Sequence, residues 1–243
     1  MTSPSGLEPA PADRAAPSPR SAARSQERLA YGLATIAGFV DAYGIMTYGV
    51  YVSFMSGNTT QTGYNAGLGA FSAAAPSALA ILFFVGGSFA GTLLTQFAGR
   101  RARRLVFGVV AAALAAIIGF SQLGSLSAGV HIAIACFGMG VMNTTLSRVG
   151  AQSVSLTFVT GTLSRVGSNL ALAFRRAPLP DAQGPWDTHL RRAMLLARIW
   201  AGFLAGALLS GAATPRFGAW VLLAPVLILA TMAVFDRPAG ATG

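Results

Sequence analysis

The chain has 243 residues, of which 53% are hydrophobic and only 10% are charged, and its mean hydropathy is +0.60. Soluble domains carry about 25% charged residues, so this composition excludes an ordinary soluble domain. The apolar runs are continuous and rich in Ala, Leu and Gly, whereas the strands of a membrane β-barrel alternate apolar and polar residues. We therefore expect an all-α membrane protein.

The net charge of +10 does not predict nucleic-acid binding, because the arginines cluster at the ends of apolar runs. This distribution is the one that the positive-inside rule describes for membrane proteins. Cys136 is the only cysteine, so no intramolecular disulfide can form. His131 and His189 lie far apart and have no neighbour at ligand spacing. We expect no metal site, no cofactor and no nucleic-acid partner.

In chain order, residues 1–28 come first and are rich in Pro, Ala, Ser and Arg, so they are predicted to be a disordered cytoplasmic tail. Two membrane units follow, 29–123 and 124–235, and the chain ends in a tail, 236–243. The second unit contains a polar cytoplasmic loop at 175–192. Runs close to the roughly 20 residues that cross a bilayer predict spans at 29–48, 76–98, 105–123, 130–146, 193–213 and 217–235.

Two stretches, 49–75 and 149–174, differ from ordinary spans because small and polar residues lie at their centres. Non-helical backbone at membrane depth is tolerated only where it is buried in protein or lines a cavity. We therefore expect both stretches to be broken or re-entrant segments. Their central residues are Ser56, Gly57, Asn58 and Thr59 in the first stretch, and Thr160, Gly161 and Thr162 in the second.

The positions of the arginines favour one topology. Arg24 and Arg28 place the N-terminus in the cytoplasm by the charge rule. If both broken segments enter and leave on one side, the arginine-rich loops at 99–104 and 175–192 also face the cytoplasm. The prediction is six transmembrane helices plus two broken segments, with both termini inside. The alternative is eight shorter spans.

Three blocks of sequence recur in the same order in the two units. Inverted repeats with glycine-interrupted segments at corresponding positions are typical of transporter cores. We therefore predict a 3+3 inverted repeat, with a duplicated bundle that does not transport as the alternative. The corresponding pairs are Gly38 and Gly140, Asp41 and Asn143, Gly57 and Gly161, Gly87 and Gly202, and Gly91 and Gly206.

Asp41 is the only carboxylate inside the apolar body, because every other acidic residue lies in a tail or in the polar loop. A charged group at the bilayer centre costs about 2.5–3.5 kcal/mol on insertion scales, which makes it a functional-site candidate. Asp41 follows Leu29 by about 18 Å of helix, just beyond the midplane. Such a carboxylate can exchange a proton or hold a monovalent cation. The other interpretation is a protonated Asp that only hydrogen-bonds a neighbouring helix.

Residues 38–42 (GFVDA) and 51–59 (YVSFMSGNT) together resemble the signature of the YoaK-type family of bacterial integral membrane proteins. That signature is approximately G-x-x-D-A followed by F-V-S-x-M-T-G-N-T. Residues 158–162 (FVTGT) are similar to its second T-G block. This chain departs from the pattern at Tyr51 and Ser56, where the family usually has Phe and Thr. The resemblance covers 29–235 and implies a multi-pass inner-membrane protein without an established activity.

We expect a secondary carrier of an unknown small solute, coupled to protons or cations, that self-associates in the bacterial inner membrane. A non-transporting scaffold or sensor is the alternative. A membrane enzyme is less favoured, because the sequence shows neither a nucleophile with a base nor a metal cluster, and it has no ATP-binding loop. The predicted substrate or ion site consists of Asp41, Ser56, Gly57, Asn58, Thr59, Asn143, Thr160, Gly161 and Thr162.

Overall fold

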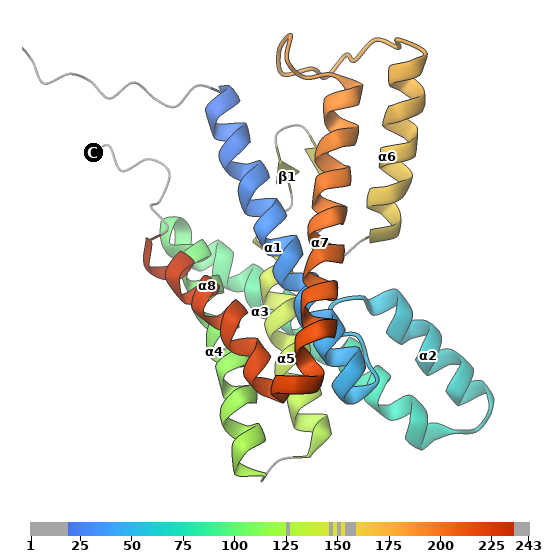
Figure 1. Ribbon diagram of the computed structural model, residues 1–243, viewed down its shortest axis with the longest axis vertical. Helices are drawn as coiled ribbons and strands as arrows, with labels where there is room; N and C mark the ends of the chain where they lie inside the picture. The colour runs from blue at the N-terminus through green and yellow to red at the C-terminus, as the bar shows by residue number, and fades with distance from the viewer. Residues whose placement is uncertain (1–18, 125–126, 146–147, 150–151, 154–158, 236–243) are drawn as a thin grey trace, which may run out of the picture.

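The computed structural model describes residues 19–124, 127–145, 148–149, 152–153 and 159–235 (Figure 1). The described part of the chain is almost entirely helical, with one pair of antiparallel two-residue strands. The elements are α1 (Pro19–Tyr48), α2 (Met55–Gly67), α3 (Phe71–Ala98), η1 (Gly99–Arg101), α4 (Ala102–Leu123), α5 (Ala128–Asn143), β1 (Arg148–Val149), β2 (Gln152–Ser153), α6 (Val159–Phe174), α7 (His189–Phe217), η2 (Gly218–Leu222) and α8 (Leu223–Phe235).

Four helical stretches among the described residues are long and apolar enough to cross a membrane, which confirms the all-α membrane class. They are Arg24–Tyr48, Phe71–Ala98, Ala102–Leu123 and the continuous stretch His189–Phe235. The last stretch contains α7, η2 and α8, and Gly218 has a φ of 53° at the point where the chain turns back (Figure 1). α5 is a shorter apolar helix.

Helices α2 and α6 are shorter than a membrane crossing. Their 13 and 16 residues correspond to about 20 and 24 Å of helix, against a hydrocarbon thickness of about 30 Å. In Figure 1, α2 runs from the middle of the molecule downward and α6 runs from the middle upward. α2 packs along α3, and α6 packs along α7. The two stretches that sequence predicts to be broken thus contain half-length helices.

Glycines bring the long helices together in two pairs, α1 with α7 and α3 with α5. A methyl group on Gly206 of α7 would overlap the backbone carbonyl of Thr35 in α1. In the other pair, a methyl group on Gly140 of α5 would overlap the carbonyl of Phe84 in α3. Small residues at membrane helix contacts allow this close backbone approach, so the glycines set the spacing in both pairs.

Both helix pairs are parallel. Glu27 lies beside Arg191, and further along the same helices Gly206 approaches Phe39, so residue numbers rise together in α1 and α7. In the other pair, Gly87 approaches Phe137, and one turn further along α3, Gly91 approaches Thr144. Residue numbers therefore rise together in α3 and α5 as well. Figure 1 shows the first pair running downward and the second pair running upward. α4 packs on α5 and α8, and its Phe107 and Leu114 are fully buried in the core.

The first helix is longer than the sequence predicts. α1 begins at Pro19, so the last ten residues of the predicted disordered tail 1–28 are helical, while residues 1–18 lie outside the described part. The Ser, Ala, Arg, Gln and Glu residues of this extension tolerate or favour a helix. Glu27 also forms an ion pair with Arg191 at 2.5 Å, which ties the extension to α7.

Substitution of Gly140 by Ala tests the close contact between α3 and α5. The added methyl group would meet the backbone of Phe84 and Ser88, which can yield only if the helices separate. Overpacking of this kind costs about 1–3 kcal/mol, so we expect a lower midpoint of thermal unfolding in detergent. Gly119→Ala is the control, because nothing lies within 4 Å of its added methyl group. An equal loss in both variants would show that the contact does not determine stability.

Candidate functional site

The carboxylate of Asp41 is buried in α1, with 4% of the residue exposed. Its Oδ1 accepts hydrogen bonds from the backbone amides of Val52, at 2.8 Å, and Ser53, at 2.7 Å. Its Oδ2 accepts a hydrogen bond from the Ser53 hydroxyl at 2.8 Å. All three donors belong to the segment 49–54 that links α1 to α2. Asp41 therefore holds that segment against its own helix.

The linking segment returns along α1 because two glycines permit it. Gly49 has a φ of 71°, a conformation that glycine adopts without a steric cost, and it ends the helix. Gly44 faces the returning chain, where any side chain would overlap Val52 and approach the carbonyl oxygen of Val50. With these two positions open, the segment reaches back from the end of α1 to Asp41.

Asn58, in the first turn and a half of α2, fixes the other side of the linking segment. Its side chain is fully buried and pairs with the backbone of Tyr51. The Tyr51 amide donates to Asn58 Oδ1 at 3.0 Å, and Asn58 Nδ2 donates to the Tyr51 carbonyl at 2.6 Å. The thiol of Cys136 in α5 lies 3.9 Å from the same carbonyl. We call Asp41, Ser53, Asn58 and the segment 49–54 the Asp41 clamp.

The structure separates the remaining predicted residues of the first stretch from the Asp41 clamp. Ser56 is exposed on α2. Thr59 is also exposed, and its hydroxyl bonds to the carbonyl of Met55 within the same helix. Gly57 packs against the ring of Tyr51, where a methyl group would overlap the ring. Gly57 therefore supports the clamp sterically, whereas Ser56 and Thr59 point away from it.

The predicted residues of the second stretch lie on α5 and α6. Asn143 ends α5, and its Oδ1 is buried without a hydrogen-bond partner among the described residues. In the first turn of α6, Thr160 is exposed, Gly161 is half-buried and Thr162 is buried. The loop that precedes α6 is mostly outside the described residues, so the structure does not show a second clamp.

Ser53 is the functional-site residue that the sequence does not single out. It supplies two of the three hydrogen bonds to Asp41. A serine in an apolar segment is common, and its pairing with a carboxylate far back in the chain depends on the reversal at Gly49. Ser53 is, however, one of the residues in the run 51–59 that carries the family resemblance, and this is the signal in the sequence that could have identified it.

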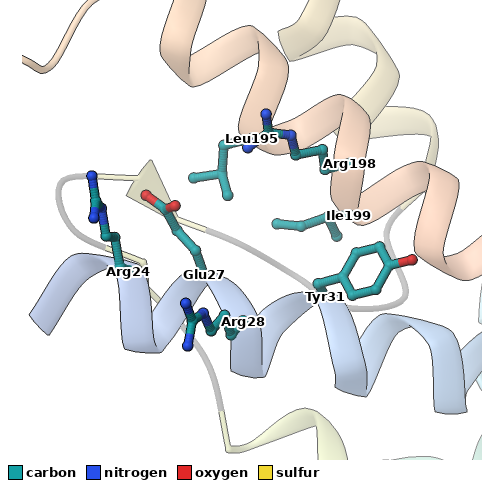
Figure 2. Close-up of a pocket in the computed structure, with 7 residues that line it drawn as sticks. All are labelled: Arg24, Glu27, Arg28, Tyr31, Leu195, Arg198 and Ile199. Carbon is teal, nitrogen blue, oxygen red and sulfur yellow. The ribbon is translucent and has the colours of Figure 1, made fainter. Parts of the chain in front are cut away.

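Four cavities lined by described residues lie away from Asp41, which lines none of these four. One of them, of about 440 Å³, lies between the N-terminal halves of α1 and α7 (Figure 2). Another, of about 580 Å³, is an apolar hollow beside α3 and α5. Within the described residues, no group of three or more His, Cys, Asp or Glu side chains could hold a metal ion.

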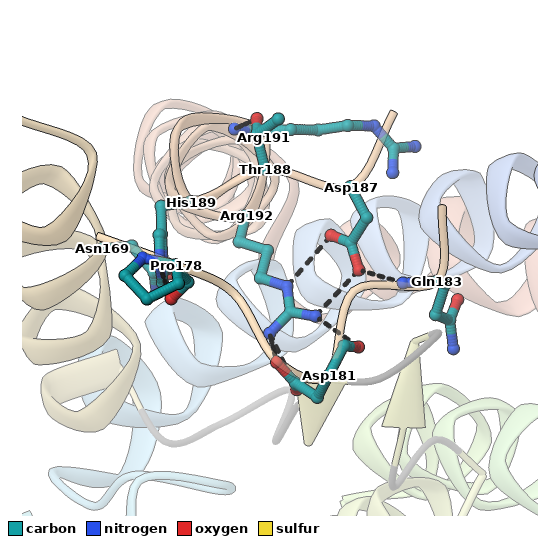
Figure 3. A network of polar contacts seen from close by, with 9 residues as sticks. All are labelled: Asn169, Pro178, Asp181, Gln183, Asp187, Thr188, His189, Arg191 and Arg192. Atoms are coloured by element: carbon teal, nitrogen blue, oxygen red, sulfur yellow. Dashed lines mark hydrogen bonds and ion pairs between the residues drawn. The ribbon is translucent and has the colours of Figure 1, made fainter. Parts of the chain in front are cut away.

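A second polar cluster fastens the loop between α6 and α7 (Figure 3). The buried guanidinium of Arg192 donates to Asp187 at 2.8 and 3.0 Å and to the carboxylate of Asp181 at 3.0 and 3.1 Å. The hydrogen bonds from Arg192 hold the pKa of Asp187 below its usual value, against the opposing effect of burial. His189 joins this loop to Asn169 of α6 at 3.2 Å. These contacts hold the loop in shape, and Asp187 and His189 also line a cavity of about 420 Å³ beside it.

Removal of the Asp41 carboxylate tests the clamp. In Asp41→Ala the buried amides of Val52 and Ser53 lose their acceptor, at a cost of about 1–3 kcal/mol for each unsatisfied donor. We expect the midpoint of thermal unfolding to fall clearly. Asp41→Asn should lose less, because its side-chain carbonyl can still accept both amides.

Thr92→Ala is the control for this measurement, because the exposed Thr92 hydroxyl bonds, among the described residues, only to the Ser88 carbonyl of its own helix. We expect its thermal midpoint to stay near that of the wild type. An Asp41→Ala variant as stable as Thr92→Ala would show that the clamp does not hold the linking segment.

The comparisons with known proteins agree with the membrane fold and add a family. Residues 29–235 match the family model described as "Protein of unknown function (DUF1275)". The chain is also similar to the UPF0700 transmembrane protein RA0705 of Rhizobium meliloti (strain 1021), with 29% identity over 214 residues that cover 86% of each chain. No solved structure matches this chain significantly. The resemblance to an uncharacterised family of multi-pass membrane proteins is confirmed, and this chain belongs to the DUF1275 family.

Proposed function

We propose that this chain is a secondary carrier of a small solute in the bacterial inner membrane. The observation that carries the proposal is the pair of half-length helices, α2 and α6, each packed along a long helix, α3 or α7. In Figure 1 each begins in the middle of the molecule, and they run in opposite directions. Interrupted segments at corresponding positions of two inverted units are the mark of a transporter core.

The packing of the helices supports two related units. If α1 to α4 correspond in order to α5 to α8, the contact of α1 with α7 corresponds to that of α5 with α3. The contact of α2 with α3 likewise corresponds to that of α6 with α7. The contact of α4 with α8 joins two corresponding helices, so exchanging the two units leaves it unchanged. The first pair runs downward and the second upward in Figure 1. This correspondence favours six spans and two half helices over eight spans.

The glycines support the same correspondence. Gly38 approaches the backbone of Phe203, and Gly140 approaches that of Ser88 and Phe84. In the sequence repeat Gly38 corresponds to Gly140, and Phe203 corresponds to Ser88. Residues that match in sequence therefore make matching contacts in the two helix pairs. A chance likeness of Gly-rich segments would not require this agreement.

The charges favour a cytoplasmic location for both ends of the chain. The parallel contact of α1 with α7, with Glu27 paired to Arg191, brings Arg24 and Arg28 to the same end of the molecule as Arg192. The positive-inside rule places this end in the cytoplasm. α8 returns toward the same end in Figure 1.

We propose that the Asp41 clamp is the coupling element. Hydrogen bonds to a charged acceptor are about twice as strong as those to a neutral one. Protonation of Asp41, or cation binding to it, would weaken its bonds to Val52 and Ser53 and would free the segment that leads into α2. Asn143, at the corresponding position of the second unit, cannot ionise, so the response would be confined to the first unit.

A non-transporting scaffold or sensor is the second candidate, and one observation favours it. Both oxygens of Asp41 are engaged by donors of its own chain, and Asn58 is fully buried. A purely structural clamp would look the same. The two candidates differ in whether the clamp opens and whether water reaches the starts of α2 and α6.

Transport by an Asp41→Asn variant tests the coupling. Purified protein in liposomes with an internal pH-sensitive dye would be exposed to gradients of a panel of small anions, sugars, amino acids and amines. We expect a solute-driven pH change with the wild type and with Thr92→Ala, and a loss of at least about tenfold with Asp41→Asn, since its side chain binds no proton at neutral pH. Wild-type flux in a correctly inserted Asp41→Asn protein would end the coupling proposal.

Thiol accessibility separates the carrier from the scaffold. Ser56→Cys and Thr160→Cys, in a Cys136→Ser background, place single thiols at the exposed starts of α2 and α6. A carrier predicts that a membrane-impermeant maleimide labels both in liposomes. Leu82→Cys, exposed on the apolar helix α3, should stay unlabelled in the bilayer. Labelling of neither site would favour the scaffold.

A further inference from the structure

The cavity between α1 and α7 combines a basic rim with an apolar floor (Figure 2). It has a volume of about 440 Å³. Arg24 and Arg28 reach it from α1, and Arg198 reaches it from α7. Its other lining residues are Glu27, Tyr31, Leu195 and Ile199. We call this feature the arginine cavity.

The positive charge of the arginine cavity is not neutralised within the described part of the protein. Its one carboxylate, Glu27, is paired with Arg191 at 2.5 Å, and Arg191 lies outside this lining. Among the described residues, no ion pair or hydrogen bond engages the side chain of Arg24, Arg28 or Arg198. Three guanidinium groups therefore line one cavity without an ion-pair partner among the described residues.

The depth of Arg198 distinguishes this cavity from a set of arginines that only fixes topology. Arg198 lies about 9 Å along α7 beyond Arg192, the last residue of the polar loop, and it is the one charged residue in the stretch 193–215. A guanidinium there must either extend to the interface or meet an anion that reaches into the bilayer. The adjoining Ile199, Leu195 and Tyr31 present an apolar surface suited to a hydrocarbon chain.

We propose that the arginine cavity binds the phosphate group of an anionic phospholipid of the inner leaflet. Guanidinium groups bind phosphate oxygens through paired, charge-assisted hydrogen bonds. Basic pockets between membrane helices on the cytoplasmic side are suited to such headgroups. The acyl chains would lie along the apolar floor. A free phosphate ion would satisfy the arginines equally but would leave that floor uncovered, which favours the lipid.

Lipid binding by purified protein tests the proposal. The full chain in a mild detergent would be titrated with phosphatidylglycerol, with phosphatidylcholine and separately with inorganic phosphate, and bound lipid would be counted by native mass spectrometry. We expect phosphatidylglycerol to bind in preference to phosphatidylcholine. Arg198→Gln should weaken phosphatidylglycerol binding roughly fivefold, and the triple Arg24→Gln, Arg28→Gln, Arg198→Gln variant about a hundredfold, since each basic group contributes about a factor of five.

Arg175→Gln and Arg101→Gln are the matched controls, because both arginines are exposed and line none of the four cavities. They should keep wild-type lipid binding. Arg198→Lys keeps the positive charge but cannot form the paired hydrogen bonds of a guanidinium group. We expect its affinity for phosphatidylglycerol to lie between those of the wild type and Arg198→Gln. Lipid binding would be compared only among variants whose thermal midpoint without lipid equals that of the wild type.

Three results would overturn the proposal. Equal losses in the control variants would show that overall charge attracts the lipid. Equal binding of phosphatidylcholine and phosphatidylglycerol would show that the cavity does not recognise the negative charge of the headgroup. A rise in the thermal midpoint with millimolar inorganic phosphate that is abolished by Arg198→Gln, together with no preference for phosphatidylglycerol, would assign the cavity to a soluble phosphate.

Discussion

The carboxylate of Asp41 determines the course of the chain between α1 and α2. Buried backbone amides find no water, so each must be paired within the protein. Helical residues pair with their own helix, but Val52 and Ser53 lie in a non-helical segment and use Asp41 instead. A buried carboxylate is costly unless several donors satisfy it, and here three do. The carboxylate supplies the acceptors that the amides of the non-helical segment need, and the segment supplies the donors that the buried carboxylate needs.

The two kinds of helix in the structure are attached by different interactions. The long helices meet through glycines such as Gly140 and Gly206, at backbone contact. α2 is held by polar side chains, through Asn58 to the backbone of Tyr51 and through the Thr62 hydroxyl to that of Ser77 at 2.8 Å. α6 is linked to the start of α7 through Asn169 and His189. Hydrogen bonds of this kind can be exchanged for bonds to water or to a polar ligand, whereas the backbone contacts at the glycines cannot, so the proposed carrier would move its half helices against a fixed frame.

The N-terminal halves of α1 and α7 meet at one end of this frame. Glu27 and Arg191 join the two helices there, and Arg192 secures the loop that enters α7. The arginine cavity lies directly beside these contacts and shares Glu27 with them. A phospholipid headgroup in that cavity would add a contact between α1, which carries the Asp41 clamp, and α7, which carries α6. The proposed lipid site and the proposed coupling element therefore act on the same helix pair.

The sequence by itself determined the features that depend on composition and local pattern. Hydropathy predicts the membrane class, and the runs around Gly57 and Gly161 predict where helices are interrupted, because apolar length and chain breaks are properties of contiguous residues. It predicts Asp41 and Asn58 as important residues but assigns them to an open substrate site. The sequence also does not predict that α1 starts at Pro19, since the ion pair of Glu27 with Arg191 joins residues distant in the chain.

Only the tertiary structure decided what Asp41 touches and which arginines meet. The bonds to Val52 and Ser53 require the reversal at Gly49, and the arginine cavity requires α1 to pack in parallel on α7. Both depend on close approach between backbones, which glycines allow but do not specify in sequence. A pattern of residues records which side chains can pair, whereas the path of the folded chain selects which pairs form.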